Sequence, residues 1–212
     1  SLAFAETTYL PGAAEVTGLA GARFSSTLDL TNAGSAGTTV TIGLVPTVGK
    51  AAPAPVTRTL AAGESLRIPS ALKTLFGLAD GAAGTITVSS ADAILASLST
   101  QNVAAPEGAY GLGLLPVSET ELLGAGETGH SIWVSQSADT STGYRTNLSV
   151  TLADAGSVVE VRVYDKGAVL FVKRIPYAEA VAGAPDRDTA IRAFMEKTIQ
   201  TVTAAIARGK IG

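Results

Sequence analysis

Few residues of this 212-residue chain could do chemistry. It has no cysteine and one histidine, His130, which excludes thiol nucleophiles, disulfides, thiolate-bound zinc and any site that needs two imidazoles. A histidine base needs a nucleophile and an orienting carboxylate, and the sequence identifies neither beside His130. We interpret His130 as a surface or structural residue and predict that the protein is not an enzyme. Catalysis by carboxylates alone is the open alternative, because such acids are paired only in space.

Two further motifs resemble binding loops. Residues 124–129 satisfy the pattern G-x-G-x-x-G, but a dinucleotide loop lies between a strand and a helix, and here a strand-like segment, 131–135, follows. The acidic residues around Asp139 and at 186–188 lack the dense spacing of a calcium loop. We therefore predict a glycine turn, no cofactor and no metal.

Three aromatic side chains are candidates for ligand binding: Trp133, Tyr144 and Tyr110. Exposed rings of this kind can stack on sugars, whereas core packing is the alternative for the only tryptophan. Aromatic residues make up only 5% of the chain, which counts against a stacking site because such a site needs spare rings.

Charge and hydropathy limit the partners. The net charge is −3 and the pI is about 5.2, which argues against binding to nucleic acid. No apolar run approaches the roughly 18 residues of a membrane span. Residues 1–5 end in the small-x-small pattern Ala3-x-Ala5, which is typical of the tail of a secretory signal peptide. We therefore expect an exported protein, extracellular or at the cell surface, although Leu2 and Phe4 also fit a first strand.

The elements that would position these residues are short strands. Alternating apolar and polar residues predict strands at 23–31, 39–44, 55–60, 65–68, 85–89 and 93–100. We expect the first two to form an antiparallel hairpin and the next two a second hairpin. Residues 70–77 predict a short helix that Ser70 caps and Gly77 ends. This rhythm is typical of a β-sandwich.

The strand pattern then restarts. Residues 24–31 align with 144–151, and residues 40–44 align with 159–163. We predict a mainly β chain of two tandem antiparallel sandwiches, with a short helix in the first and a C-terminal amphipathic helix. The predicted divisions are an N-terminal extension at 1–8, sandwiches at 9–113 and 114–185, and the helix at 186–212. Whether the second sandwich is complete or lacks strands stays open.

The C-terminal segment has its own periodicity. Apolar residues recur at helical spacing from Ile191 to Ile206, with charged residues on the opposite side. The β-branched residues between 198 and 206 also fit a strand, so that alternative stays open.

Two motifs carry a family resemblance. Residues 28–34, followed by 40–42, form a strand, an Asn-x-Gly turn and a second strand, and residues 60–65 read Leu-Ala-Ala-Gly-Glu-Ser. Together with Tyr144–Leu148, they are similar to immunoglobulin-like sandwich repeats of secreted and cell-surface bacterial proteins. The resemblance implies an extracellular, non-catalytic scaffold or adhesive role and transfers no site residues.

These observations lead to two functional hypotheses. The first is a structural protein of a bacterial surface that associates with copies of itself or with other surface proteins, as a rod or filament subunit. Strand exchange is one route, with residues 1–10 as the donor and Leu2, Phe4 and Tyr9 as its plugs. The alternative is a module that binds a carbohydrate or another small ligand.

Overall fold

The computed structural model describes residues 6–18, 21–47, 50–104, 110–130, 158–165 and 167–176. The chain divides into two units, Ser1–Gly124 and Ala125–Gly212, which are described separately. Both are mainly β, and all their strand pairs are antiparallel across the described ranges. No helix in those ranges is long and apolar enough to cross a membrane.

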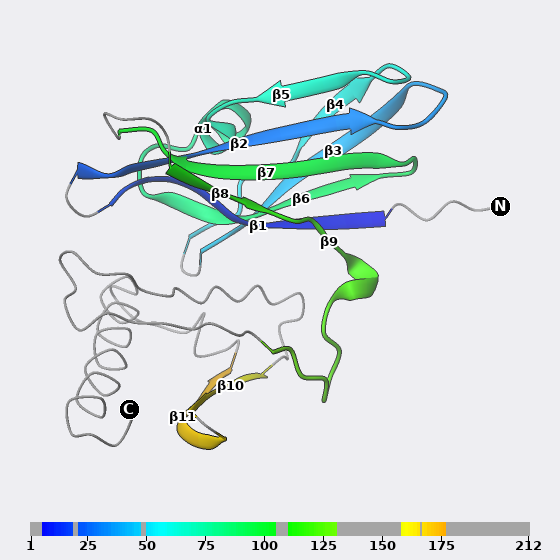
Figure 1. Ribbon diagram of the computed structural model, residues 1–212. Coiled ribbons are helices and arrows are strands. Elements are labelled where there is room, and N and C mark those ends of the chain that lie inside the picture. The colour runs from blue at the N-terminus through cyan, green and yellow to red at the C-terminus, as the bar shows by residue number, and fades with distance from the viewer. Residues whose placement is uncertain are drawn as a thin grey trace. The chain divides into compact units, whose positions relative to one another are not determined.

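Within its described residues, the first unit has nine strands, the short helix α1 and a 3-10 turn (Figure 1). The strands are β1 (Glu6–Thr17), β2 (Arg23–Asn32), β3 (Thr38–Pro46), β4 (Val56–Leu60), β5 (Ser65–Ile68), β6 (Ala82–Ser90), β7 (Ile94–Asn102), β8 (Tyr110–Leu114) and β9 (Val117–Ser118). The helical segments are α1 (Ala71–Phe76) and the 3-10 turn η2 (Glu119–Glu121).

A single strand joins the two halves of the sheet. The strand order is β4-β3-β6-β1-β2-β7-β8, with β5 beside β2 and β9 beside β1. Residues 6–15 of β1 pair with β6, whereas residues 15–17 pair with β2. Figure 1 shows the half with β2, β5 and β7 lying over the half with β3, β4 and β6. The sheet therefore closes on itself as a sandwich-like structure around one core.

The alternation of the sequence correctly predicts the buried faces. Leu28 and Leu30 of β2 are buried, and so are Val40, Ile42 and Leu44 of β3, as their spacing predicts. The core draws on both halves of the sheet and on α1; its members are Leu10, Ala13, Leu28, Leu30, Val40, Ile42, Leu44, Leu60, Ile68, Ala71, Leu72, Leu75, Ile86, Val88 and Leu98. Burial of each large aliphatic side chain contributes about 1.5–3 kcal/mol.

The two predicted hairpins are wrong. β2 pairs with β1, β5 and β7, whereas β3 pairs with β4 and β6. The turn at 33–37 therefore carries the chain from one half of the sandwich to the other, and the turn at 61–64 carries it back. Alternation predicts which face of a strand is buried, but not which strand pairs with it. Two consecutive strands with buried faces can pair in one sheet or pack against each other from opposite sheets.

Helix α1 confirms the predicted short helix, but its start differs from the prediction. Gly77 ends the helix with φ +65°, and its N–H bonds the carbonyl of Lys73 at 2.9 Å. Ser70 makes no side-chain capping bond, because its φ of 45° and ψ of 55° are left-handed rather than the extended values of a capping residue.

Within the described part of the second unit, two strands form an antiparallel hairpin. They are β10 (Val158–Asp165) and β11 (Ala168–Pro176). The predicted strand at 159–163 lies within β10. The rest of the predicted second sandwich and the choice between helix and strand at 198–206 lie outside the described residues and stay predictions, as do the predicted domain divisions.

Candidate functional site

Most of the residues predicted to bind or assemble lie outside the described ranges. This is true of Trp133, Tyr144, Leu2 and Phe4. Tyr110 is the first residue of β8, and its side chain is not described. The hypothesis of a ligand-binding platform therefore stays a prediction.

Tyr9 is half-buried in β1, between Thr87 of β6 and Val117 of β9. The next residue, Leu10, is fully buried opposite Ile86. Residues 6–10 are therefore part of the sheet of their own sandwich.

β8 is the terminal strand of the sheet. It pairs with β7 through Asn102↔Tyr110, Thr100↔Leu112 and Leu98↔Leu114. Within the part of the chain that is described, no strand pairs with its other edge. Such an edge presents backbone N–H and C=O groups that a further strand can bind.

The two faces of β8 differ. Leu112 and Leu114 lie on the face that carries Thr100 and the buried Leu98, which are their partners in the register. Residues 111 and 113 on the other face are glycines. A Cβ at Gly111 would come within 2.5 Å of the Gln101 Cγ and 2.9 Å of the Thr100 carbonyl oxygen, whereas at Gly113 it would meet nothing within 4 Å. Gly111 is therefore required by its contact with β7, and the space at Gly113 is open.

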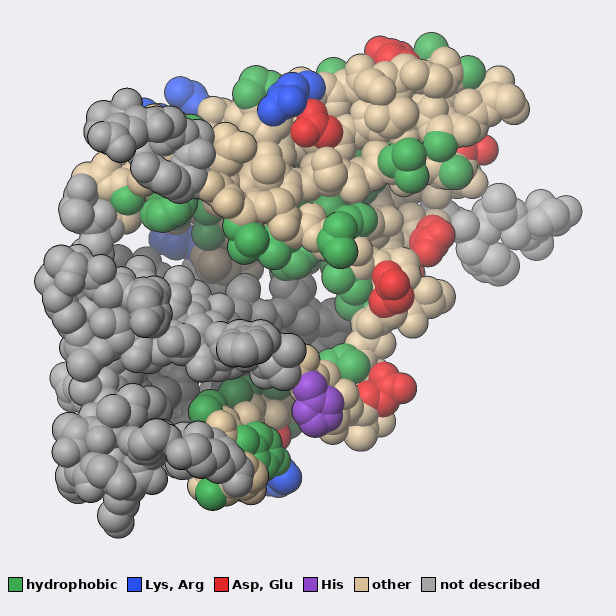
Figure 2. Space-filling view, viewed as in Figure 1, with side chains coloured by type: hydrophobic (Ala, Val, Ile, Leu, Met, Phe, Trp, Pro, Cys, Tyr) green, Lys and Arg blue, Asp and Glu red, His purple; other side chains and the backbone are tan. Residues whose placement is uncertain are grey.

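Two leucines at this edge are exposed. Leu112 is 61% exposed although it lies on the core-facing side of its strand, and Leu115, just after β8, is 85% exposed. Figure 2 shows hydrophobic side chains along the side of the first unit where β8 and β9 run. Exposed apolar side chains beside an open strand edge are typical of a protein–protein contact surface. We call this surface, residues 110–115, the β8 edge.

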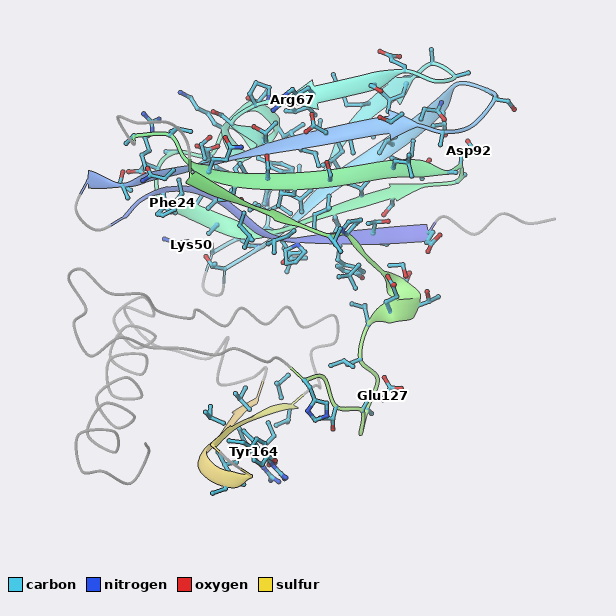
Figure 3. All side chains as sticks on the ribbon, in the orientation of Figure 1. Phe24, Lys50, Arg67, Asp92, Glu127 and Tyr164 are labelled. Carbon is cyan, nitrogen blue, oxygen red and sulfur yellow. The ribbon has the colours of Figure 1, made fainter. Side chains whose placement is uncertain are left out.

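The opposite terminal strand, β4, has a different edge. The strand exposes Thr57, Arg58 and Thr59, and prolines at 53 and 55 precede it. The next strand in sequence, β5, pairs with β2 in the other half of the sheet and carries Arg67, whose guanidinium lies 3.8 Å from the Asp29 carboxylate of β2 (Figure 3). Charges and prolines at an edge are features that discourage pairing with a further chain.

Interior polar side chains hold the sandwich together. Asn32 is fully buried, and its amide nitrogen lies 2.8 Å from the carbonyl oxygen of Ala36, 3.2 Å from that of Leu60 and 2.9 Å from that of Ala61. Its side-chain oxygen accepts a bond of 2.9 Å from the Gly34 N–H. One side chain thus joins the turns 33–37 and 61–64, and we call this region the Asn32 corner. The sequence predicts the Asn-x-Gly turn, but no local pattern shows that one buried residue joins it to the turn at 61–64.

A second buried group lies where β1 leaves β6. The hydroxyl of Ser26 accepts a bond of 2.7 Å from the Ala14 N–H and lies 2.6 Å from the Thr100 Oγ1. Thr100 in turn donates to the Gly12 carbonyl at 2.8 Å. The Ser26 hydroxyl also lies 3.2 Å from the Ala14 carbonyl oxygen, to which it can donate. These bonds hold β1 at the bulge between Leu10 and Ala13, where its strand register shifts.

A third group contains a buried carboxylate that the sequence analysis also missed. Glu15 is 6% exposed and accepts a bond of 2.9 Å from the Ser25 hydroxyl. The Ser70 hydroxyl lies 3.2 Å from that of Ser25 and donates to it, because Ser25 has only one proton. The chain of bonds ties β1 and β2 to the turn before α1. Alternation alone indicates that Glu15 faces inward, on the same face as Ala13.

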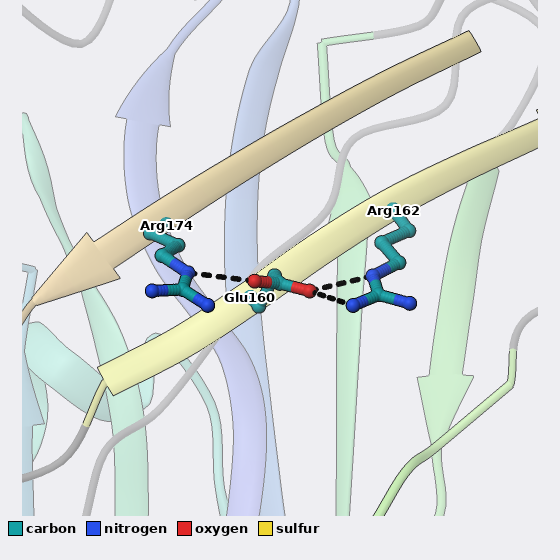
Figure 4. Close-up of polar contacts among 3 residues, drawn as sticks. All are labelled: Glu160, Arg162 and Arg174. Carbon is teal, nitrogen blue, oxygen red and sulfur yellow. Dashed lines mark hydrogen bonds and ion pairs between the residues drawn. The ribbon is translucent and has the colours of Figure 1, made fainter. Parts of the chain in front are cut away.

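The hairpin β10–β11 carries a charged group on one face (Figure 4). The Arg174 Nε donates to one Glu160 oxygen at 2.7 Å, and Arg162 contacts the other oxygen. These two hydrogen bonds, that of Arg174 first, lower the pKa of Glu160. Hydrogen bonds to Tyr164 and then to Glu160 raise the pKa of Arg162. Glu160 faces Arg174 directly in the register, so the group stabilises this strand pairing.

The described residues contain no group of three or more histidine, cysteine or acidic side chains that could hold a metal ion. The strongest candidate site is therefore the β8 edge, and it is a surface for protein contact.

Comparison with known proteins adds little to this geometry. No protein-family model matches the sequence, and no curated protein matches it. A similar solved structure is the crystal structure of Thermotoga maritima 1070, which is 17% identical with a TM-score of 0.43. The match covers 53% of this chain and 93% of that chain.

Proposed function

We propose that this chain is a non-catalytic structural protein of a bacterial surface or extracellular assembly, and that it works by associating with other protein chains. The observation that carries the proposal is the β8 edge. Its terminal strand has no charged residue and contains Leu112, which is 61% exposed, and Leu115, just after the strand, is 85% exposed. Monomeric proteins commonly protect such an edge, whereas proteins that assemble use it.

The interior of the first unit supports a scaffold role. Asn32 and Ser26 are fully buried, and each hydrogen-bonds to backbone groups of a neighbouring strand or turn. In this proposal the interior polar groups hold the strands in place, and the partner binds at the surface.

The finer part of the proposal concerns family and location. The motifs at 28–34 and 60–65 are similar to those of immunoglobulin-like repeats of secreted bacterial proteins, and Asn32 bonds directly to the second motif. We propose two tandem sandwiches, export through a signal peptide, and a place at the cell surface or outside the cell.

We assign the association to the β8 edge rather than to a donor segment at residues 1–10. Residues 6–10 already pair with β6. Donating them to another chain would remove this part of β1 from its own sandwich. The β8 edge needs no such rearrangement.

Light scattering on the purified full chain, measured as micromolar concentration rises, tests the proposal. We expect the average mass to exceed that of the 21.3 kDa monomer and to fall on dilution. A mass that stays at the monomer value over the whole range would overturn the proposal. Negative-stain images of the same samples distinguish filaments from small oligomers.

A further inference from the structure

We infer that the partner at the β8 edge is a second copy of this chain, paired antiparallel through β8 about a two-fold axis at Leu112. The inference rests on the proposed function and names its partner. In this pair the half-sheets of the two copies become one continuous sheet across the junction of the two β8 strands.

The sequence of β8 is self-complementary in that register. With Leu112 opposite Leu112, Tyr110 lies opposite Leu114 and Gly111 lies opposite Gly113. Every apolar position thus meets an apolar position on one face, and every glycine meets a glycine on the other. Residues directly opposite in an antiparallel pair share a face, so the exposed Leu112 side chains of the two copies contact each other.

Charge favours β8 over the other edges for such a pair. Residues 110–118 contain no charged side chain. The same two-fold arrangement of β4 about its central residue would place Arg58 opposite Arg58, and in β5 it would bring the two copies of Arg67 close together. Like charges in cross-strand pairs are destabilising, so the symmetric pairing suits β8 alone among these three edges.

The size of the contact sets its strength. A five-residue strand provides a few backbone hydrogen bonds and buries Leu112, which is a smaller contact than the roughly 1,200–2,000 Å² of a stable interface. We therefore expect a weak dimer that forms as concentration rises through the micromolar range. An extended peptide from another protein is the other possible occupant, and the experiment below distinguishes the two.

A disulfide scan tests the axis directly, because the chain has no cysteine of its own. In the proposed pair, the two copies of Leu112→Cys have Cα atoms about 4.5–5.5 Å apart, within the range that a disulfide spans. The matched control is Leu115→Cys. Its side chain is more exposed, but in this register its two copies lie about 20 Å apart along the strands.

Under mild oxidation of the full chain, we expect Leu112→Cys to form a covalent dimer at least about tenfold faster than Leu115→Cys. Random collision would give the opposite order, because Leu115 is 85% exposed and Leu112 is 61% exposed. Equal rates, or faster cross-linking at 115, would overturn the inference.

A pair of charge variants gives an independent test without oxidation. Gly113→Lys adds a charge to the β8 edge at a position where a Cβ meets nothing within 4 Å. The matched control, Thr59→Lys, adds the same charge to an exposed position of β4. We expect Gly113→Lys to weaken association about tenfold and Thr59→Lys to leave it unchanged, both measured by sedimentation or light scattering.

The outcomes separate this inference from the proposed function. A chain that associates but shows no preference for the cross-link at 112 would overturn the two-fold pair and leave the structural role standing. A chain that stays monomeric and shows no such preference would overturn both.

Discussion

The Asn32 corner and the β8 edge differ in how their polar groups are used. At the corner, one buried amide bonds to the carbonyl oxygens of residues 36, 60 and 61, at 2.8, 3.2 and 2.9 Å. At the edge, the backbone groups on the outer side of β8 have no partner strand within the described residues, and Leu112 is 61% exposed. The corner is closed by its own side chain, whereas the edge is open to another chain.

The difference indicates that stability and association depend on separate residues. A substitution at a buried hydrogen-bonding side chain changes the free energy of unfolding, because it leaves partners without a bond. A substitution at the exposed edge leaves the fold unchanged and alters only contact with another chain. The following variants test this separation, from the largest expected change in stability to the smallest.

The largest loss of stability is expected for Asn32→Ala. The change removes the bonds to three carbonyl oxygens and leaves the Gly34 N–H, which is partly buried, without its acceptor. We expect the free energy of unfolding to fall by about 3 kcal/mol, measured by urea denaturation.

The matched control for Asn32 is the adjacent Thr31→Ala, which removes a single exposed bond of 2.8 Å to the Ser65 hydroxyl. Its expected loss is below about 1 kcal/mol. Equal losses for the two variants would show that the corner is not what closes this end of the sandwich.

A smaller loss is expected for Ser26→Ala, which removes the acceptor of the Ala14 N–H and the bond to Thr100. We expect about 2 kcal/mol, because one partly buried backbone donor loses its partner and the bond between two hydroxyls is lost. Thr100→Ser keeps the second hydroxyl and is the control, with a smaller loss. If Thr100→Ser costs as much as Ser26→Ala, the packing of the methyl group rather than the hydroxyl network stabilises β1.

The sequence predicts the local features of this fold but not its long-range contacts. Alternation correctly predicts which residues of β2 and β3 are buried, and apolar spacing with Gly77 correctly predicts α1, because each signal lies within a few residues. The partner of each strand is set by the whole core, so both predicted hairpins are wrong. Asn32 bonds to Leu60, 28 residues away, and no local pattern marks that pair.

The sequence singles out one residue of the β8 edge, Tyr110, for its ring, but it does not predict the edge itself, and the reason is physical. β8 contains two glycines in five residues, and glycine in the interior of a strand weakens the signal on which strand prediction depends. The glycine at 111 is required by its contact with Gln101, which is visible only in the structure. The aromatic residues that the sequence analysis chose were selected for ring chemistry, whereas the site found here depends on a strand edge.

Leu112→Thr should weaken association and leave stability almost unchanged, whereas the variants of buried hydrogen-bonding residues should lower stability. The substitution keeps a strand-forming residue and removes exposed apolar surface at a position 61% exposed, so we expect the free energy of unfolding to change by about 0.5 kcal/mol or less. Association should weaken about tenfold, because the central apolar contact of the proposed pair is lost. Unfolding curves and light scattering on one sample measure both. A large loss of stability would place Leu112 in the core of the single chain.

The smallest effect is expected at Asp80, where an exposed side chain ties the end of β1 to the loop before β6. The Thr17 hydroxyl donates to the Asp80 carboxylate at 2.6 Å, and this bond is the main reason that the pKa of Asp80 is lowered. A lowered pKa in the folded state means that the stabilisation is complete above the unfolded pKa, about 3.9, and is lost as pH falls through the lower folded value. Asp80→Asn should therefore reduce stability slightly at pH 7, and the difference from the wild type should vanish in acid. Urea unfolding of both proteins from neutral to acidic pH measures this, and a difference that persists below the titration of Asp80 would show that its charge is not the cause.

Because Asp80 is exposed and Ser26 is buried, the ratio of the stability lost in Asp80→Asn and in Ser26→Ala shows how much burial strengthens a hydroxyl bond that anchors β1.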